Sequence, residues 1–242
     1  MEGELMTRLV KFGLALALGV AVLSPPASAA PVVQVVTVKV NPGMLDQYLQ
    51  ETQKLQGILA RLGSKGTMRV WNTTAGGTDA GTTIVGLEYP DEAAWATDSP
   101  KIQADAEWKK LVAGLANIRT LVGTSLWRDI STSASASAPG KVLVLTGVAV
   151  KPGQLEEYRK RVGTASAINE RLGLTGRVRI WHADLAGPAT GSVAVGVEYP
   201  DVATYVAEQA KLSADAEWKA FLSGLDSVRT VTGRWMYQEV TP

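Results

Sequence analysis

The chain contains an internal repeat that covers most of its 242 residues. When the sequence is shifted by 110 positions, Val32–Ile130 aligns with Val142–Val240 without a gap, and 35 of the 99 aligned positions are identical. The hexapeptide Ala104–Lys109 recurs intact as Ala214–Lys219. A repeat of this length predicts two globular copies rather than a solenoid of short units. The fold must therefore be one that a single unit can form twice in tandem.

Each copy has the element order β-α-β-β-α-β. In copy one, the β-branched run Val32–Val40 predicts the first strand. The triplet 41–43 (Asn-Pro-Gly) predicts an N-cap and a first-turn proline for a helix that Gly63 ends. Further strands are expected over 67–73, 82–89 and 119–130.

The second helix of each copy is expected to start at the aspartate after a proline, Asp91 in copy one. Pro100 stands where copy two has Ala210. A proline inside a helix removes a hydrogen bond and clashes with the preceding turn. We therefore expect this helix to be broken in copy one only.

This order describes a ferredoxin-like unit, a four-stranded antiparallel sheet with both helices on one face. The uncovered sheet face needs a partner, and the second copy supplies one within the chain. We predict an α+β protein with two such units packed sheet to sheet within one chain, which makes the monomer a pseudo-dimer. The expected domains are unit one (30–130), a Ser/Ala-rich linker (131–140) and unit two (141–242).

The first 29 residues are typical of a signal peptide. Arg8 and Lys11 precede an apolar run over 12–23, and an Ala-x-Ala site ends at Ala29. We expect cleavage after Ala29 and a periplasmic or secreted mature protein without a stable membrane anchor. The alternatives are an uncleaved N-terminal anchor and, for the start of translation, Met6 instead of Met1.

Composition excludes several classes of chemistry. The chain has no cysteine and one histidine, which rules out disulfides, thiolate metal sites and any site that needs two histidines. Its 24 basic and 23 acidic residues give a net charge of +1, so nucleic acid is not an expected partner. We predict no metal site and no cofactor, and at most a small organic ligand as partner.

At the level of the whole repeat, the sequence resembles the dimeric α/β-barrel superfamily. The segments that begin Asp105-Ala-Glu-Trp-Lys and Asp215-Ala-Glu-Trp-Lys resemble the second helix of NIPSNAP-like domains. The next most similar type is the antibiotic-biosynthesis-monooxygenase-like domain. The resemblance implies two units paired sheet to sheet. Because the superfamily includes oxygenases, isomerases, haem enzymes and members without known activity, the resemblance does not assign a function.

Strand alternation identifies the residues that face the space between the sheets. If the apolar sides lie under the helices, Arg69, Trp71 and Glu88 point inward from unit one. A register that pairs Arg69 with Glu88 would place Trp71 opposite Gly86. The equivalent inward residues of unit two are Arg179, Trp181 and Glu198.

The first strand of each unit differs between the copies. The same alternation turns Thr37 and Lys39 inward in unit one, where unit two has Gly147 and Ala149. Since the smaller residues lie in unit two, any open space is expected in that half.

Two tryptophans and two Arg–Glu pairs would suit a flat ligand, and the leading hypothesis is an exported protein that binds a small aromatic or amphipathic molecule. One alternative is a cofactor-free oxygenase or isomerase for an acidic substrate, with His182 or Glu198 as the base. Another is a protein-interaction module without a functional cavity. The structural alternative for the ion pairs is a cross-strand role at the sheet rim.

Overall fold

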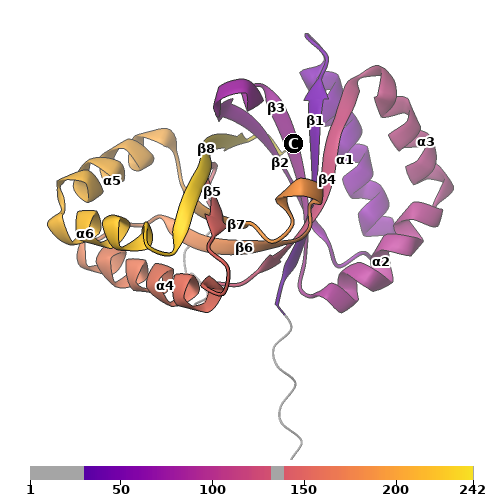
Figure 1. Cartoon of the computed structure of the whole chain (residues 1–242). Coiled ribbons are helices and arrows are strands. Elements are labelled where there is room, and N and C mark those ends of the chain that lie inside the picture. The colour runs from indigo at the N-terminus through magenta and orange to yellow at the C-terminus, as the bar shows by residue number, and fades with distance from the viewer. Residues whose placement is uncertain (1–29, 132–138, 242) are drawn as a thin grey trace, which may run out of the picture.

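The structure, a computed structural model, describes residues 30–131 and 139–241. The predicted signal peptide and most of the predicted linker lie outside these residues. Each half of the chain folds as a β-α-β-β-α-β unit, as predicted (Figure 1). Unit one contains β1 (Val32–Val40), α1 (Leu45–Arg61), β2 (Thr67–Ala75), β3 (Thr82–Tyr89), α2 (Glu92–Ala104), α3 (Ala106–Gly114) and β4 (Arg119–Asp129). Unit two contains β5 (Val142–Val150), α4 (Leu155–Arg171), β6 (Arg177–Leu185), β7 (Val193–Tyr199), α5 (Val202–Ala214), α6 (Ala216–Leu225) and β8 (Arg229–Glu239).

The eight strands form one closed antiparallel barrel in the order β1-β3-β2-β8-β5-β7-β6-β4. The two sheets face each other as predicted, and they are also hydrogen-bonded at both edges, through β2 with β8 and β4 with β6. These seams satisfy the edge strands within the chain. The two sets of helices cover opposite outer sides of the barrel (Figure 1).

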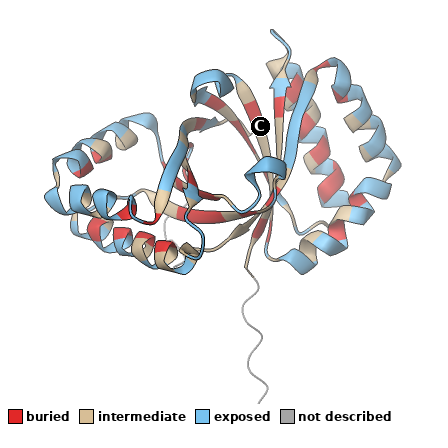
Figure 2. Cartoon of the chain, viewed as in Figure 1, coloured by how far each residue is buried: buried red, intermediate tan, exposed pale blue. Residues whose placement is uncertain are grey.

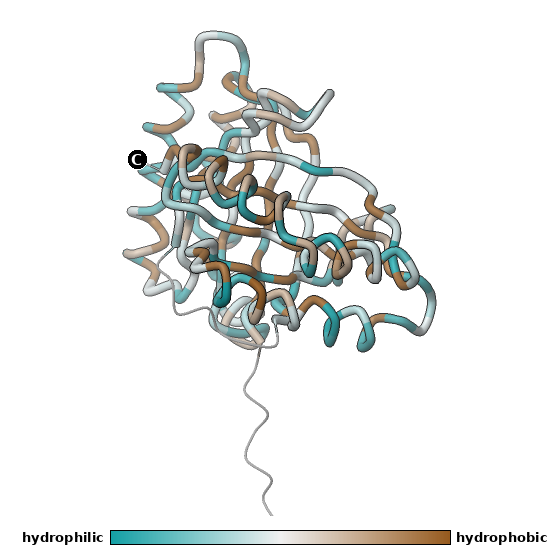
Figure 3. The backbone as a smooth tube through the Cα atoms, turned by 90° about the vertical axis from the view of Figure 1, so that its left-hand side faces the viewer, coloured by the Kyte–Doolittle hydropathy of each residue, from teal (hydrophilic) through white to brown (hydrophobic). Residues whose placement is uncertain are grey.

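The helices bury one face each against the sheet. In Figure 2 the buried positions lie along the strands and on the helix faces toward them, and in Figure 3 hydrophobic and hydrophilic residues alternate along the helices. In unit one, Tyr48, Leu55 and Leu59 of α1 pack with Val38 and Met68 of the sheet. The largest apolar clusters thus lie between helices and strands, outside the barrel.

Two local predictions about the helices are wrong. The Asn-Pro-Gly triplet forms a turn rather than a cap: Gly43 has φ +77°, and α1 begins after Met44 without a side-chain cap. The second helix is broken in both units, not only in unit one. The break lies at Asp105 and Asp215, because each has an extended backbone and its carboxylate caps the following helix. Pro100 lies inside α2 without ending it.

Two other helix ends, the start of α2 and the end of α1, lie where the sequence signals predicted them. Asp91 caps α2 by accepting a hydrogen bond from the backbone N–H of Ala94. Gly63 follows α1 with φ +65°, a conformation that favours glycine, and its N–H closes the last turn. No helix among residues 30–131 and 139–241 is both long and apolar enough to cross a membrane.

Candidate functional site

A cavity of about 270 Å³ lies inside the barrel, and we call it the barrel cavity. Its apolar walls come from both units and include Val33, Val35, Trp71, Ile84, Trp127, Leu143, Leu145, Trp181, Ala194 and Tyr237. The six residues predicted from alternation to face the space between the sheets all line it: Arg69, Trp71, Glu88, Arg179, Trp181 and Glu198. Their inward orientation follows from strand periodicity, while their role in ligand binding stays a prediction.

The predicted hairpin register is wrong by two residues. Arg69 lies opposite Gly86, and Glu88 lies opposite Thr67. Unit two has the same register, with Arg179 opposite Gly196. The shift keeps the same side chains on the inner face, because two residues are one full period of a strand. It does move each arginine away from the glutamate of its own unit.

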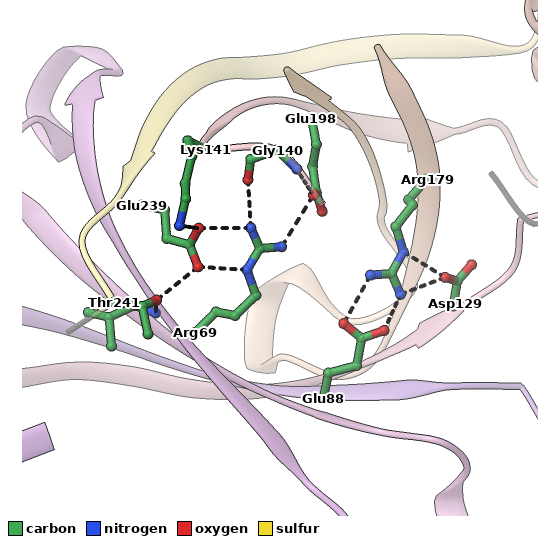
Figure 4. A network of polar contacts seen from close by, with 10 residues as sticks. Arg69, Glu88, Asp129, Gly140, Lys141, Arg179, Glu198, Glu239 and Thr241 are labelled. Atoms are coloured by element: carbon green, nitrogen blue, oxygen red, sulfur yellow. Dashed lines mark hydrogen bonds and ion pairs between the residues drawn. The ribbon is translucent and has the colours of Figure 1, made fainter. Parts of the chain in front are cut away.

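The two arginines instead bind acids of the opposite unit (Figure 4). Arg69 donates from Nε to Glu239 at 2.9 Å and from Nη1 to Glu198 at 3.2 Å. Its Nη2 also donates to the carbonyl oxygen of Gly140 at 2.6 Å. The predicted pairing of Arg69 with Glu88 within unit one is therefore replaced by a contact between units.

Arg179 makes the reciprocal contact. It donates from Nε to Asp129 at 2.9 Å and from Nη1 to Glu88 at 3.0 Å, and both acids belong to unit one. Burial acts to lower the pKa of Arg179, but the hydrogen bonds and charges of Glu88 and Asp129 outweigh it and raise the pKa. The guanidinium thus stays charged, and its fork is engaged by carboxylates on two sides.

Sequence reasoning missed Asp129 and Glu239. These two acids occupy the same position in the repeat, at the end of the last strand of each unit. Each acid lies two residues after a side chain that lines the cavity, Trp127 or Tyr237. Strand alternation therefore predicts that both acids also point inward. Their contact with an arginine could not be foreseen, because it depends on the β2–β8 and β4–β6 seams.

Acid should weaken the protein through Glu239. Burial would raise the pKa of this carboxyl, but hydrogen bonds from Arg69, Lys141 and Thr241 outweigh it and lower the pKa from 4.5 to about 2. A carboxyl with a depressed folded pKa contributes stability above its unfolded pKa and loses it as the pH falls through the folded value. Urea midpoints of the wild type should therefore fall between about pH 4.5 and pH 2, and those of Glu239→Gln should fall less. Equal losses in the two proteins would contradict this assignment.

The open space lies on the side of unit one, opposite to the prediction. A Cβ added at Gly86 would have one neighbour within 4 Å, Val33 Cγ2 at 3.6 Å. At the equivalent Gly196, a Cβ would lie 2.5 Å from Cζ3 of Trp181. The Trp181 ring therefore covers its glycine, whereas Trp71 leaves Gly86 open.

Trp235 fills the place where Gly147 was expected to leave space. A Cβ added at Gly147 would lie 3.0 Å from the Trp235 ring, and one at Gly233 would clash with it. Nε1 of Trp235 donates to Asp79 at 2.8 Å. Unit one has Ser125 at the equivalent position, and Ser125 lines the cavity. The exchange of a serine for a tryptophan between the copies thus explains the asymmetry.

His182 lies outside the barrel cavity. Strand β6 continues past His182 to Leu185, because the end of β6 pairs with β4. Nδ1 of His182 lies 2.8 Å from Asp184, and the other oxygen of Asp184 accepts from Nε of Arg128. This network joins the two units at the β4–β6 seam. Among the described residues, no cluster of histidine and carboxylate side chains could hold a metal ion.

The comparisons with known proteins identify the fold. Neither the family models nor the curated proteins give a match. Among solved structures, a candidate monooxygenase of Fusobacterium nucleatum is 13% identical over 88% of this chain and 94% of its own, with a TM-score of 0.60. The chain has the dimeric α/β-barrel fold.

Other neighbours with this fold differ widely in what they are described to do. An anthrone oxidase-like protein is 16% identical over 89% of this chain and 92% of its own, with a TM-score of 0.59. A chlorite dismutase variant of Candidatus Nitrospira defluvii is 7% identical over 88% of this chain and 92% of its own, with a TM-score of 0.52. Identities this low describe the fold alone, so function must be argued from the cavity.

Proposed function

We propose that the protein binds a small aromatic or amphipathic molecule in the barrel cavity. The observation that carries the proposal is a mostly apolar cavity inside the barrel with three tryptophans in its wall. Sites with these properties suit flat organic ligands. An interaction module without a cavity is the less favoured alternative, because the sheets leave space between them.

The polar groups of the cavity favour a neutral ligand. Both arginines are already bound by two carboxylates each, so neither is free to bind an acidic ligand. The geometry thus favours a flat neutral molecule.

Fluorenone, a flat aromatic ketone, is a suitable probe. The wild type should bind it with 1:1 stoichiometry, measured by tryptophan fluorescence and calorimetry. Gly86→Leu should weaken binding at least about tenfold because it fills the cavity, and Trp181→Phe should weaken it several-fold because it removes part of the aromatic wall. Gly57→Leu is the control, since Gly57 is exposed on α1 outside the barrel and a Cβ there would meet nothing within 4 Å. Binding that is unchanged in Gly86→Leu would overturn the proposal.

An oxygenase activity is the second candidate, and the monooxygenase and anthrone oxidase-like neighbours favour it. Anthrone and O2 would give anthraquinone and water, with Glu198 as the base because His182 does not line the cavity. The wild type would then raise oxygen uptake above the spontaneous rate, and Glu198→Gln would abolish the increase. An acidic substrate is less favoured, because both arginines of the cavity are already bound by carboxylates.

We also propose that the mature protein is exported after cleavage behind Ala29 and acts as a monomer. The N-terminal basic and apolar regions support export, and closure of the barrel within one chain removes the need for a partner copy. The NIPSNAP-like relationship rests on the repeated Asp-Ala-Glu-Trp-Lys segment. Light scattering of the secreted protein should give the mass of one chain, and the mass of a dimer would refute the monomer.

A further inference from the structure

A second cavity lies outside the barrel, between the sheet and the helices of unit two. It has a volume of about 400 Å³, and we call it the helix–sheet cavity. Its walls include Val162 and Ala165 of α4, Val178 and Val197 of the sheet, and Phe221 of α6. Leu222 and Val231 also line it and are exposed, so the cavity reaches the surface of the molecule.

Substitutions between the two copies account for this cavity. The equivalent region of unit one is filled by a packed cluster that includes Leu55, Leu59 and Met68. Unit two replaces large side chains with smaller or polar ones at four equivalent positions: Leu55 by Ala165, Leu59 by Asn169, Met68 by Val178 and Leu87 by Val197. Space left by such replacements lowers stability unless something fills it.

Two polar side chains in the wall each have a buried atom without a hydrogen-bond partner among the described residues. The Oδ1 atom of Asn169 is buried without a hydrogen bond among the described residues. The guanidinium of Arg229 has no ion pair in the same part of the chain, and its Nε is likewise buried without a partner. Its Nη1 makes one long contact of 3.4 Å, to the hydroxyl of Tyr158.

The charge of Arg229 is not compensated by its neighbour. Burial raises the pKa of Tyr158 above its usual value against the opposing effect of Arg229, so the hydroxyl stays neutral. An uncompensated guanidinium beside an apolar cavity favours an anionic group on the ligand, because a carboxylate can accept two of its N–H bonds. The barrel cavity differs on this point, since its arginines are already bound by acids.

We propose that the helix–sheet cavity is a second binding site, for a molecule with an apolar body and a single carboxylate. The apolar body would occupy the space beside Ala165 and Val178, and the carboxylate would bind Arg229. This site is separate from the barrel cavity and does not depend on the function proposed there.

Decanoate is the probe for this site, and decanol is its uncharged counterpart. Calorimetry on the full chain should show one decanoate per molecule, bound about tenfold more tightly than decanol because of the charge-assisted hydrogen bonds. Arg229→Gln should abolish the difference between the two probes. A wild type without saturable decanoate binding, or one that binds decanol equally well, would overturn the proposal.

A cavity-filling variant tests the location. Ala165→Leu with Asn169→Leu restores the unit-one residues, and it should abolish decanoate binding, raise the melting temperature and leave fluorenone binding unchanged. Asn169→Leu alone is the second variant in case the double variant does not fold, and it should weaken decanoate binding. Ser166→Gln, which introduces the unit-one residue at an exposed position of α4, is the matched control. Decanoate binding that survives both filling variants, or that is lost in Gly86→Leu instead, would place the site elsewhere.

Discussion

Replacing Arg179 with methionine is expected to lower the free energy of unfolding by about 3–5 kcal/mol. The arginine is 7% exposed and binds Asp129 and Glu88, both from the other unit. Without it, the Asp129 side chain, which is 12% exposed, keeps a charge that has lost its partner. Removing one member of a buried pair costs far more than the pair contributes, because the remaining charge stays desolvated. Urea unfolding followed by tryptophan fluorescence measures the change.

Arg61→Met is the matched control for this prediction. Arg61 binds Asp105 at 2.9 Å on the surface of unit one, with its side chain 49% exposed. Exposed ion pairs contribute little to stability, so this variant should unfold close to the wild type. Adding Asp129→Asn and Glu88→Gln to Arg179→Met should recover part of the loss, because both uncompensated charges are then removed. Equal stabilities of the Arg179 and Arg61 variants would show that the contacts between units do not hold the barrel together.

Alanine at Gly196 and at Gly86 should have opposite effects, although the two glycines are equivalent in the repeat. At Gly196 the added Cβ would lie 2.5 Å from Trp181 and 2.9 Å from Leu143. Overpacking of this kind costs about 1–3 kcal/mol. At Gly86 the closest atom would be 3.6 Å away, so alanine should be neutral or stabilise by up to about 1 kcal/mol through the entropy of the unfolded chain.

Thermal and urea unfolding of the two variants measures this difference. The comparison is internally controlled, because both glycines lie opposite an arginine in the same register of equivalent hairpins. A Gly86→Ala variant as unstable as Gly196→Ala would mean that the barrel interior is filled on both sides.

The repeat and the strand periodicity were sufficient to predict the element order, the ferredoxin-like units and the inward side chains. Register was not predictable in the same way, because it depends on the loop geometry between Ala75 and Thr82 and not on alternation. The partner of each arginine depends on strands far apart in the sequence that pair only when the barrel closes. Whether the open space lies in unit one or in unit two depends on where the rings of Trp181 and Trp235 lie. The amino-acid sequence does not determine these ring positions directly.

A crystal structure of the fluorenone complex would show whether the space beside Gly86 holds a ligand. Fluorenone should occupy the barrel cavity between Gly86 and Trp127. A fully occupied ligand at any other place on the molecule, with the barrel cavity closed by its own side chains, would show that this cavity is not the binding site.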